Sequence, residues 1–222
     1  MNVFTRISRS LGMTAGLLLC VSVAVAPAMA ATITFNFSGT IDHVQNLLNP
    51  PFTTSTSPTA MTGSMTVNTF DSNASLTRGN YAVQNFNIQI GSYSAAFGGS
   101  GLVEIRNGNG NGLGADRFIA TVTPLTGNPV NFLSPRLFDM DLRGPKTVFG
   151  SDALPTAMPS ISSFSGNNQW RLVFGPQGFG KVVSGTLTAV PLPAAVILFG
   201  AGLVALAGLG AGSWKQRKNG LA

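Results

Sequence analysis

Cysteine and histidine are almost absent from this chain of 222 residues, which contains one of each, Cys20 and His43. Because Cys20 lies in an apolar N-terminal stretch, residues 31–190 offer no thiol for a disulfide bond or a redox reaction. One histidine and no nearby thiol cannot supply the usual ligands of zinc. A Ser–His–acid triad would have to use His43, and no G-x-S-x-G motif supports one. We therefore interpret His43 as a surface histidine, either solvated or hydrogen-bonded.

Charged residues are also scarce, at 9% of the sequence, and they are unevenly distributed. The formal charge of +6 would fit nucleic-acid binding at first sight. Five of the 13 basic residues lie in the terminal segments, however, and the other eight share residues 31–190 with seven acidic residues, which leaves a net charge of +1. A nearly neutral domain is a poor phosphate-binding surface, so no nucleic-acid partner is expected.

The first 30 residues predict a signal peptide, with Arg6 and Arg9 before an apolar stretch at 11–25. The expected cleavage site is an A-x-A signature formed by Ala28 and Ala30, with Ala31 as the first mature residue. Lipidation at Cys20 is the alternative. We disfavour it because Leu19 is not a small residue and apolar sequence continues beyond the cysteine.

The C-terminal segment contains a second long apolar run, at 195–212, and no charge interrupts it. With its flanks it reaches roughly the 20 residues that a helix needs to cross a bilayer, so we predict a transmembrane helix at about 194–213. Trp214 fits an interfacial position, and the basic tail predicts a cytoplasmic end. The stop-transfer residues are Lys215, Arg217 and Lys218. An ordinary single-pass anchor is one interpretation of this segment.

A sorting signal is the other interpretation, because a short motif precedes the apolar run. The motif is Val190, Pro191, Leu192, Pro193 and Ala194. Motif, apolar span and basic tail, in this order over residues 190–222, resemble the PEP-CTERM family of bacterial exported proteins in its VPLPA variant. Leu192 stands where the main motif of that family has an acidic residue. The resemblance implies processing by an exosortase-type enzyme and delivery to the cell surface or the extracellular matrix.

Residues 31–189 have the composition of a β domain, in which Phe, Val, Ile and Thr alternate with Ser, Asn and Gly. Many short strands at this spacing predict an all-β fold, an antiparallel β-sandwich or jelly roll. We expect Phe35 and Phe37 on the buried face of the first strand, and a hairpin turn at Gly91-Ser92. Pairing of the first and last strands is expected as well, since chain termini often lie close together. Pro135 argues against a central strand where it stands.

Two Ser-Gly-Thr triplets, at 38–40 and 184–186, occur in similar strand contexts, and we interpret them as local strand chemistry. Together with the segments 63–66 and 151–155 they also resemble, weakly, a type of PEP-CTERM ectodomain to which no activity is assigned. This second resemblance implies an exported β domain.

Calcium is the metal that the sequence could best support. Asp139 and Asp141 are two residues apart on an expected strand and share one side of it, and the Gly/Asn-rich segment 108–116 ends in an acid. Calcium takes six to eight oxygen ligands, however, and these scattered acids do not form such a set. We therefore favour a plain turn with solvated acids, and predict no metal and no cofactor.

Two kinds of site could support carbohydrate chemistry, a pair of carboxylates and a platform of aromatic side chains. Any two of the seven acids could converge as a glycosidase pair, but no spacing singles out a pair. Tyr81, Tyr93 and Trp170 could form an aromatic platform for sugar, although aromatic residues in a β domain more often pack in the core.

The sequence as a whole predicts an exported surface or extracellular-matrix protein without catalytic activity. Its expected parts are a signal peptide at 1–30, a β-rich extracytoplasmic domain at 31–189 and the sorting segment at 190–222. Its expected partners are an exosortase-type enzyme and the membrane, with extracellular polysaccharide as a further one. Two alternatives stay open: a carbohydrate-binding or polysaccharide-modifying module, and an unprocessed single-pass membrane protein.

Overall fold

In the computed structural model, the structure describes residues 31–73, 75, 77–108 and 114–188. The predicted signal peptide, sorting motif, transmembrane helix and basic tail lie outside these residues. The strands are β1 (Thr32–Gly39), β2 (His43–Val44), β3 (Met61–Asp71), β4 (Arg78–Ile90), β5 (Tyr93–Arg106), β6 (Asp116–Gly127), β7 (Pro135–Gly144), β8 (Asn167–Phe174) and β9 (Lys181–Thr188), with a short 3-10 turn η1 (Ile161–Ser163). No helix in the described part of the chain is long and apolar enough to cross a membrane.

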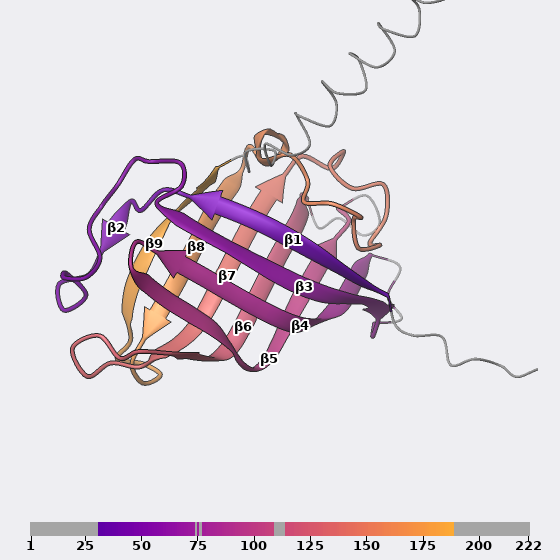
Figure 1. Cartoon of the computed structure of the whole chain (residues 1–222). Coiled ribbons are helices and arrows are strands. Elements are labelled where there is room, and N and C mark those ends of the chain that lie inside the picture. The colour runs from indigo at the N-terminus through magenta and orange to yellow at the C-terminus, as the bar shows by residue number, and fades with distance from the viewer. Residues whose placement is uncertain (1–30, 74, 76, 109–113, 189–222) are drawn as a thin grey trace, which may run out of the picture.

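The strands form one antiparallel sheet in the order β1-β3-β4-β5-β6-β7-β8-β9, and β9 pairs back onto β1. The sheet therefore closes into an eight-stranded barrel, as the curved ring of arrows in Figure 1 shows. The all-β, antiparallel prediction is confirmed, whereas a single closed sheet replaces the expected sandwich or jelly roll. The alternation of apolar and polar residues is the same in both architectures, so the local pattern did not distinguish them.

The seam between β1 and β9 is made by the two Ser-Gly-Thr triplets. Thr40 donates its backbone N–H to the Thr186 carbonyl at 2.9 Å, and the two threonine hydroxyls lie 2.8 Å apart. A Cβ on Gly39 would lie 2.4 Å from the Thr186 carbonyl oxygen, and one on Gly185 would lie 2.0 Å from that of Thr40. Only glycine permits this approach of the two backbones. The expected pairing of first and last strands is confirmed by the pairs Ser38–Thr188 and Gly39–Leu187, and the glycines of the triplets permit the close approach beside them.

Beyond Gly39 the chain bends and follows β9 as β2, so that His43 pairs with Ser184 and Val44 with Val183. Within this bend Ile41 makes an isolated bridge with Ser55. Loop 40–60 then returns to β3.

The barrel interior is filled by large apolar side chains that alternate with outward-facing residues along each strand. Phe37 lies between two aromatic neighbours, with ring centroids 6.2 Å from Phe86 and 5.6 Å from Phe138. Phe35 and Phe37 are both buried, as the sequence predicted. The largest fully buried side chains are Trp170, Phe35, Phe52, Phe86, Phe118, Phe138 and Phe174. No space for a ligand is left where such side chains interdigitate.

Two local predictions have different outcomes. Gly91 and Ser92 form the expected two-residue hairpin between β4 and β5, and Gly91 has a φ of 58°. The doubtful strand around Pro135 is a full central strand, β7, because proline is its first residue, where no ladder bond is required of it.

Residues 31–188 contain every barrel strand and the whole core described above, and the first strand pairs with the last. A segment that closes its own sheet around its own core has what an independently folding domain needs. We therefore treat residues 31–188 as a unit that folds on its own.

Candidate functional site

The two ends of the barrel differ, and each is named here by its loops. The clamp end carries loops 72–77, 107–115 and 145–166, and the tip end carries loops 40–60, 128–134 and 175–180 together with the 91–92 hairpin turn. In Figure 1 loop 145–166 lies at the upper right, opposite the loops that follow β6 and β8 at the lower left.

The carboxylates that the sequence offered for calcium are held by arginines. Asp139 and Asp141 do lie on the same side of β7, as expected. Arg171 on β8 binds Asp139 with two hydrogen bonds of 2.8 and 2.6 Å, and Arg117 on β6 binds Asp141 at 3.2 and 2.5 Å. Each carboxylate is thereby committed to a bidentate pair across neighbouring strands. Neither is left as an open oxygen ligand for calcium.

These pairs belong to a band of charge on the outer face of the barrel, which includes Glu104 between Arg78 and Arg106. The hydrogen bond to Glu104 raises the pKa of Arg106, and the hydrogen bond to Asp139 raises the pKa of Arg171. The band binds strands together and presents no pair of carboxyl groups free for glycoside hydrolysis.

Asp116 is the buried carboxylate of the clamp end, with no exposed surface. It accepts backbone hydrogen bonds from Gly108 at 2.7 Å and from Phe149 at 2.8 Å, so it joins loop 107–115 to loop 145–166. The Gly/Asn-rich segment is thus tied to its own terminal acid. Among the described residues no three acidic, histidine or cysteine side chains gather as a metal-binding group. Residues 109–113 lie outside that description.

The aromatic platform predicted as an alternative is wrong for the three residues named for it. Tyr81, Tyr93 and Trp170 are all buried inside the barrel. Trp170 donates its indole N–H to the Thr40 carbonyl at 3.1 Å, and Tyr81 donates its hydroxyl to the Asp152 carbonyl at 2.9 Å. Burial therefore uses the polar atoms of Tyr81 and Trp170 for structure, and none of the three rings forms an exposed platform.

His43 lies exposed on β2, as the surface interpretation predicted. Its neighbour across the ladder is Ser184. Arg171, the next residue across the ladder from Ser184, already binds Asp139. Asp42 lies beside this pair, but its carboxylate accepts the Thr40 hydroxyl at 2.8 Å. No hydrogen bond among the described residues joins His43 to an acid or to the Ser184 hydroxyl, so a hydrolytic triad is not linked here.

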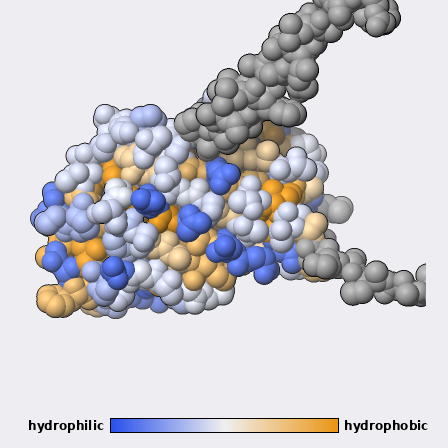
Figure 2. Space-filling model, viewed as in Figure 1, coloured by the Kyte–Doolittle hydropathy of each residue, from blue (hydrophilic) through white to orange (hydrophobic). Residues whose placement is uncertain are grey.

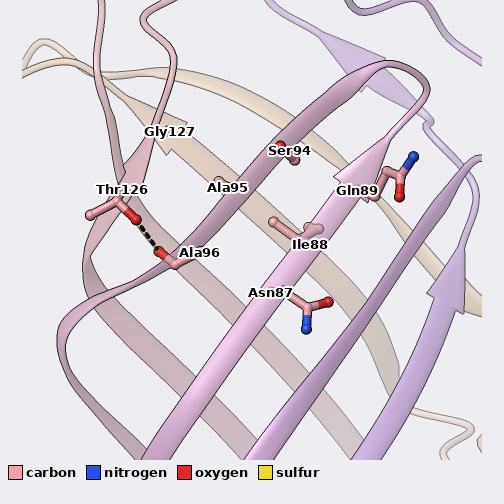
Figure 3. Close-up of a pocket in the computed structure, with 8 residues that line it drawn as sticks. All are labelled: Asn87, Ile88, Gln89, Ser94, Ala95, Ala96, Thr126 and Gly127. Atoms are coloured by element: carbon pink, nitrogen blue, oxygen red, sulfur yellow. Dashed lines mark hydrogen bonds between the residues drawn. The ribbon is translucent and has the colours of Figure 1, made fainter.

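A polar hollow of about 420 Å³ lies on the outer face over the paired ends of β4, β5 and β6 (Figure 3). Its lining residues are Asn87, Ile88, Gln89, Ser94, Ala95, Ala96, Thr126 and Gly127. Three of its polar groups are already engaged. The Asn87 amide donates to Ser64 Oγ, the Gln89 amide to the Gly91 carbonyl and the Thr126 hydroxyl to the Ala96 carbonyl. Amides and hydroxyls without a charged group can hold a neutral polar ligand but cannot perform acid–base chemistry.

A second hollow, of about 380 Å³, lies at the tip end between Pro50, Pro51, the 91–92 turn and residues 128–131. Tyr93 lines it, and the Tyr93 hydroxyl is buried without a hydrogen-bond partner. Burial raises the pKa of Tyr93 to about 12.

The tip end also exposes large apolar side chains that sequence reasoning missed. Leu47 is 53% exposed, Phe179 83% and Phe132 101%. The available signal was Asn131-Phe132 between Val130 and Leu133, because a two-residue turn there would require positive φ. No glycine marks that turn, and so it was not identified.

The fold and sites define a closed antiparallel barrel with a packed interior, an outer polar hollow and apolar loop tips. No protein-family model matches the chain, and no curated protein or solved structure shows significant similarity to it.

Proposed function

We propose that this chain is an exported surface or extracellular-matrix protein, carried by a signal peptide and a C-terminal sorting segment, with a barrel domain that acts without catalysis. The observation that carries the proposal is the order of parts: a signal peptide at 1–30, a domain that closes on itself, and the motif 190–194 before an apolar span and a basic tail. This order resembles that of PEP-CTERM proteins of the VPLPA type. The implied partner is an exosortase-type enzyme.

The end of the barrel supports this arrangement. Thr188 pairs with Ser38 on β1, and its hydroxyl donates to the Pro58 carbonyl at 2.6 Å. Every described strand therefore ends before the sorting motif begins at Val190. Cutting or anchoring the chain after residue 190 would remove none of these described strands.

The chemistry of the described residues supports a role without catalysis. Asp139, Asp141 and Glu104 are each bound by arginine, and the carboxylate of Asp116 is buried under two backbone donors. Acid–base catalysis needs a group that can reach a substrate and exchange a proton. These four carboxylates are used to hold strands and loops in place.

The mass of the mature protein tests the sorting proposal. In a host that makes a matching exosortase, Pro191→Ala with Pro193→Ala should leave export intact but block removal of the tail. The prolines fix the backbone that a processing enzyme must read, whereas a plain anchor depends on apolar length. Mass spectrometry should find the variant at full C-terminal length and the wild type shortened. Leu221→Ala, outside the motif, is the control and should behave as wild type.

Equal masses and equal membrane retention in wild type and variant would overturn the sorting proposal. In that case the single-pass anchor describes the segment.

Carbohydrate binding is the second candidate, and the outer hollow of Figure 3 favours it. Asn87, Gln89, Ser94 and Thr126 offer amide and hydroxyl groups to a neutral sugar. Screening residues 31–188 against neutral polysaccharides, with Gln89→Ala and Ser94→Ala as variants, tests it. Binding that both variants leave unchanged would remove the hollow as its site.

A further inference from the structure

Phe132 occupies a backbone position that favours glycine. Val130 and Leu133 exchange two backbone hydrogen bonds of 2.9 Å, which closes a two-residue turn. Within it Asn131 has a φ of 46° and Phe132 a φ of 67°. Such turns prefer Asn-Gly, because positive φ strains a bulky side chain. Phe132 is fully exposed and makes no contribution to the core. A strained residue that does not stabilise the core indicates a role at the surface.

The exposed apolar residues at this end form one group, called here the apolar tips: Leu47, Phe132 and Phe179. Their loops are bonded to one another. The Asn131 amide donates to the Leu47 carbonyl at 2.5 Å, and the backbone N–H of Gly175 donates to the Ser134 carbonyl at 2.9 Å. Gly178, with a φ of 87°, permits the turn that presents Phe179. The tips are thus held as a set on a fixed end of the barrel.

The charged residues beside Phe132 and Phe179 are basic. Arg136 donates to the Gly175 carbonyl at 3.1 Å, and Lys181 follows Phe179 by two residues. Loop 40–60 contains one acid, Asp42, which donates its backbone N–H to the carbonyl of Ser184, three residues along β9 from Lys181. The segments 43–70, 118–138 and 172–188 contain no aspartate or glutamate. A surface that binds here would meet apolar side chains with cations beside them.

We propose that the apolar tips and the cations beside them dock the barrel onto an anionic lipid bilayer. The tips project from loops and are not sunk in a groove. Figure 2 shows an apolar projection at the lower left, where Figure 1 places the loop between β6 and β7. Projecting apolar groups enter the boundary between headgroups and acyl chains, and the neighbouring cations face anionic headgroups. The basic residues beside the tips match an anionic bilayer better than a nearly neutral second copy of this domain.

This docking does not depend on the C-terminal segment. Lys181 and Thr188 are the two ends of β9, about 23 Å apart along the strand. A bilayer held by the apolar tips is therefore a different contact from an anchor that follows residue 188. Docking through the apolar tips goes beyond the proposed function and can be tested independently of the sorting segment.

Vesicle flotation with residues 31–188 tests the proposal. Wild type should float with vesicles of phosphatidylcholine and phosphatidylglycerol, and about tenfold less with phosphatidylcholine alone, because Arg136 and Lys181 lose their partners. Phe132→Gly and Phe179→Ser should each lower the partition coefficient by about tenfold to hundredfold, the contribution of one buried phenylalanine. Lys181→Gln should reduce binding to the anionic vesicles only.

Phe70→Ser is the matched control. Phe70 is 71% exposed near the other end of β3 and lies outside the apolar tips, so binding should not change. Phe132→Gly relieves backbone strain and should melt at or above the wild-type temperature, which separates lost binding from lost folding.

Three results would overturn the proposal: no flotation of folded wild type on anionic vesicles, equal losses in Phe70→Ser and Phe132→Gly, or unchanged flotation of Phe132→Gly with Phe179→Ser. Concentration-dependent dimers that Phe132→Gly abolishes in the absence of lipid would assign the tips to a second copy of the chain.

Discussion

The two ends of the barrel differ in whether their buried polar side chains have hydrogen-bond partners. At the clamp end the buried Tyr81 hydroxyl donates to the Asp152 carbonyl, and the buried Asp116 carboxylate accepts two backbone N–H groups. At the tip end the buried Tyr93 hydroxyl has no partner, and two non-glycine residues take positive φ. The clamp end follows the rule that buried polar groups are hydrogen-bonded, and the tip end departs from it.

The clamp end therefore contributes mainly to stability, whereas the tip end also presents apolar side chains at the surface. Loop 145–166 covers the clamp end with Phe149 and Phe164, whose ring centroids are 6.1 Å apart. Loop 40–60 closes the tip end with Leu48 and Phe52, yet exposes Leu47 beside them. Departures from local rules concentrate at functional sites in natural proteins, so we assign surface function to the tip end.

Removing the Asp116 carboxylate, which joins the two loops of the clamp end, should have the largest effect. Asp116→Ala leaves the N–H groups of Gly108 and Phe149 buried without an acceptor, and we expect the free energy of unfolding to fall by about 3–5 kcal/mol. Urea denaturation of residues 31–188 measures it. Asp42→Ala is the control, since Asp42 is exposed and accepts from the Thr40 hydroxyl. If Asp116→Ala lowered the free energy of unfolding no more than this control, Asp116 would not be holding the two loops together.

Alkaline pH should weaken the tip end selectively. The pKa of Tyr93 is raised from 10 to about 12 in the folded state, because burial disfavours the phenolate. A raised folded pKa means that its contribution is complete below pH 10 and is lost as the pH rises towards 12. Wild type should lose about 2 kcal/mol more than Tyr93→Phe across this window. Unfolding measured at pH 9 and pH 11.5 compares them. Parallel losses would show that Tyr93 ionises as freely when folded as when unfolded.

Removing one hydroxyl at each end should have opposite effects near neutral pH. Tyr81→Phe leaves the Asp152 carbonyl without its donor, and should lower the free energy of unfolding by about 1 kcal/mol. Tyr93→Phe removes a hydroxyl that has no partner, and should be neutral or stabilising. Thermal and urea unfolding of the two variants give the comparison directly. A loss from Tyr93→Phe as large as that from Tyr81→Phe would mean that the two ends are equivalent.

The smallest effect is expected at Phe132. Phe132→Gly removes the strain of a positive φ but adds conformational freedom to the unfolded chain, so we expect a net stabilisation of about 0.5 kcal/mol. Phe132→Ala, which keeps the strain, is the matched comparison and should be less stable than Phe132→Gly. The reverse order, measured by chemical denaturation, would show that the turn is unstrained.

Sequence reasoning found what depends on neighbouring residues and missed what depends on distant ones. Alternation placed Phe35 and Phe37 in the core, and the Gly91-Ser92 turn was evident from its chemistry. Closure of the sheet depends on Gly39 and Gly185, which lie 146 positions apart, and their triplets were interpreted as local features. A repeated small-residue triplet in the first and last strands is the signal that could have predicted the seam.

The candidate site was less predictable than the fold. Asp139 and Asp141 share a face as the spacing indicated, but their arginine partners come from other strands and could not be located in advance. Tyr81 and Trp170 were named for a surface that they do not reach. Nothing short-range distinguishes a phenylalanine that fills the barrel from one such as Phe179 that projects from it. The signal peptide and sorting segment stay predictions, because they lie outside the described residues.

The seam has a consequence for neighbouring copies of this protein. An open sheet offers unpaired backbone groups along its outermost strands, which can recruit a strand from another molecule. Here β9 pairs with the end of β1 through Leu187 and Thr188, and the chain from Thr40 to Gln45 bonds to the rest of β9. The strand in that stretch, β2, is only two residues long. Copies displayed densely on a surface would therefore meet through side chains and loops. Crowding should favour separate barrels over joined sheets.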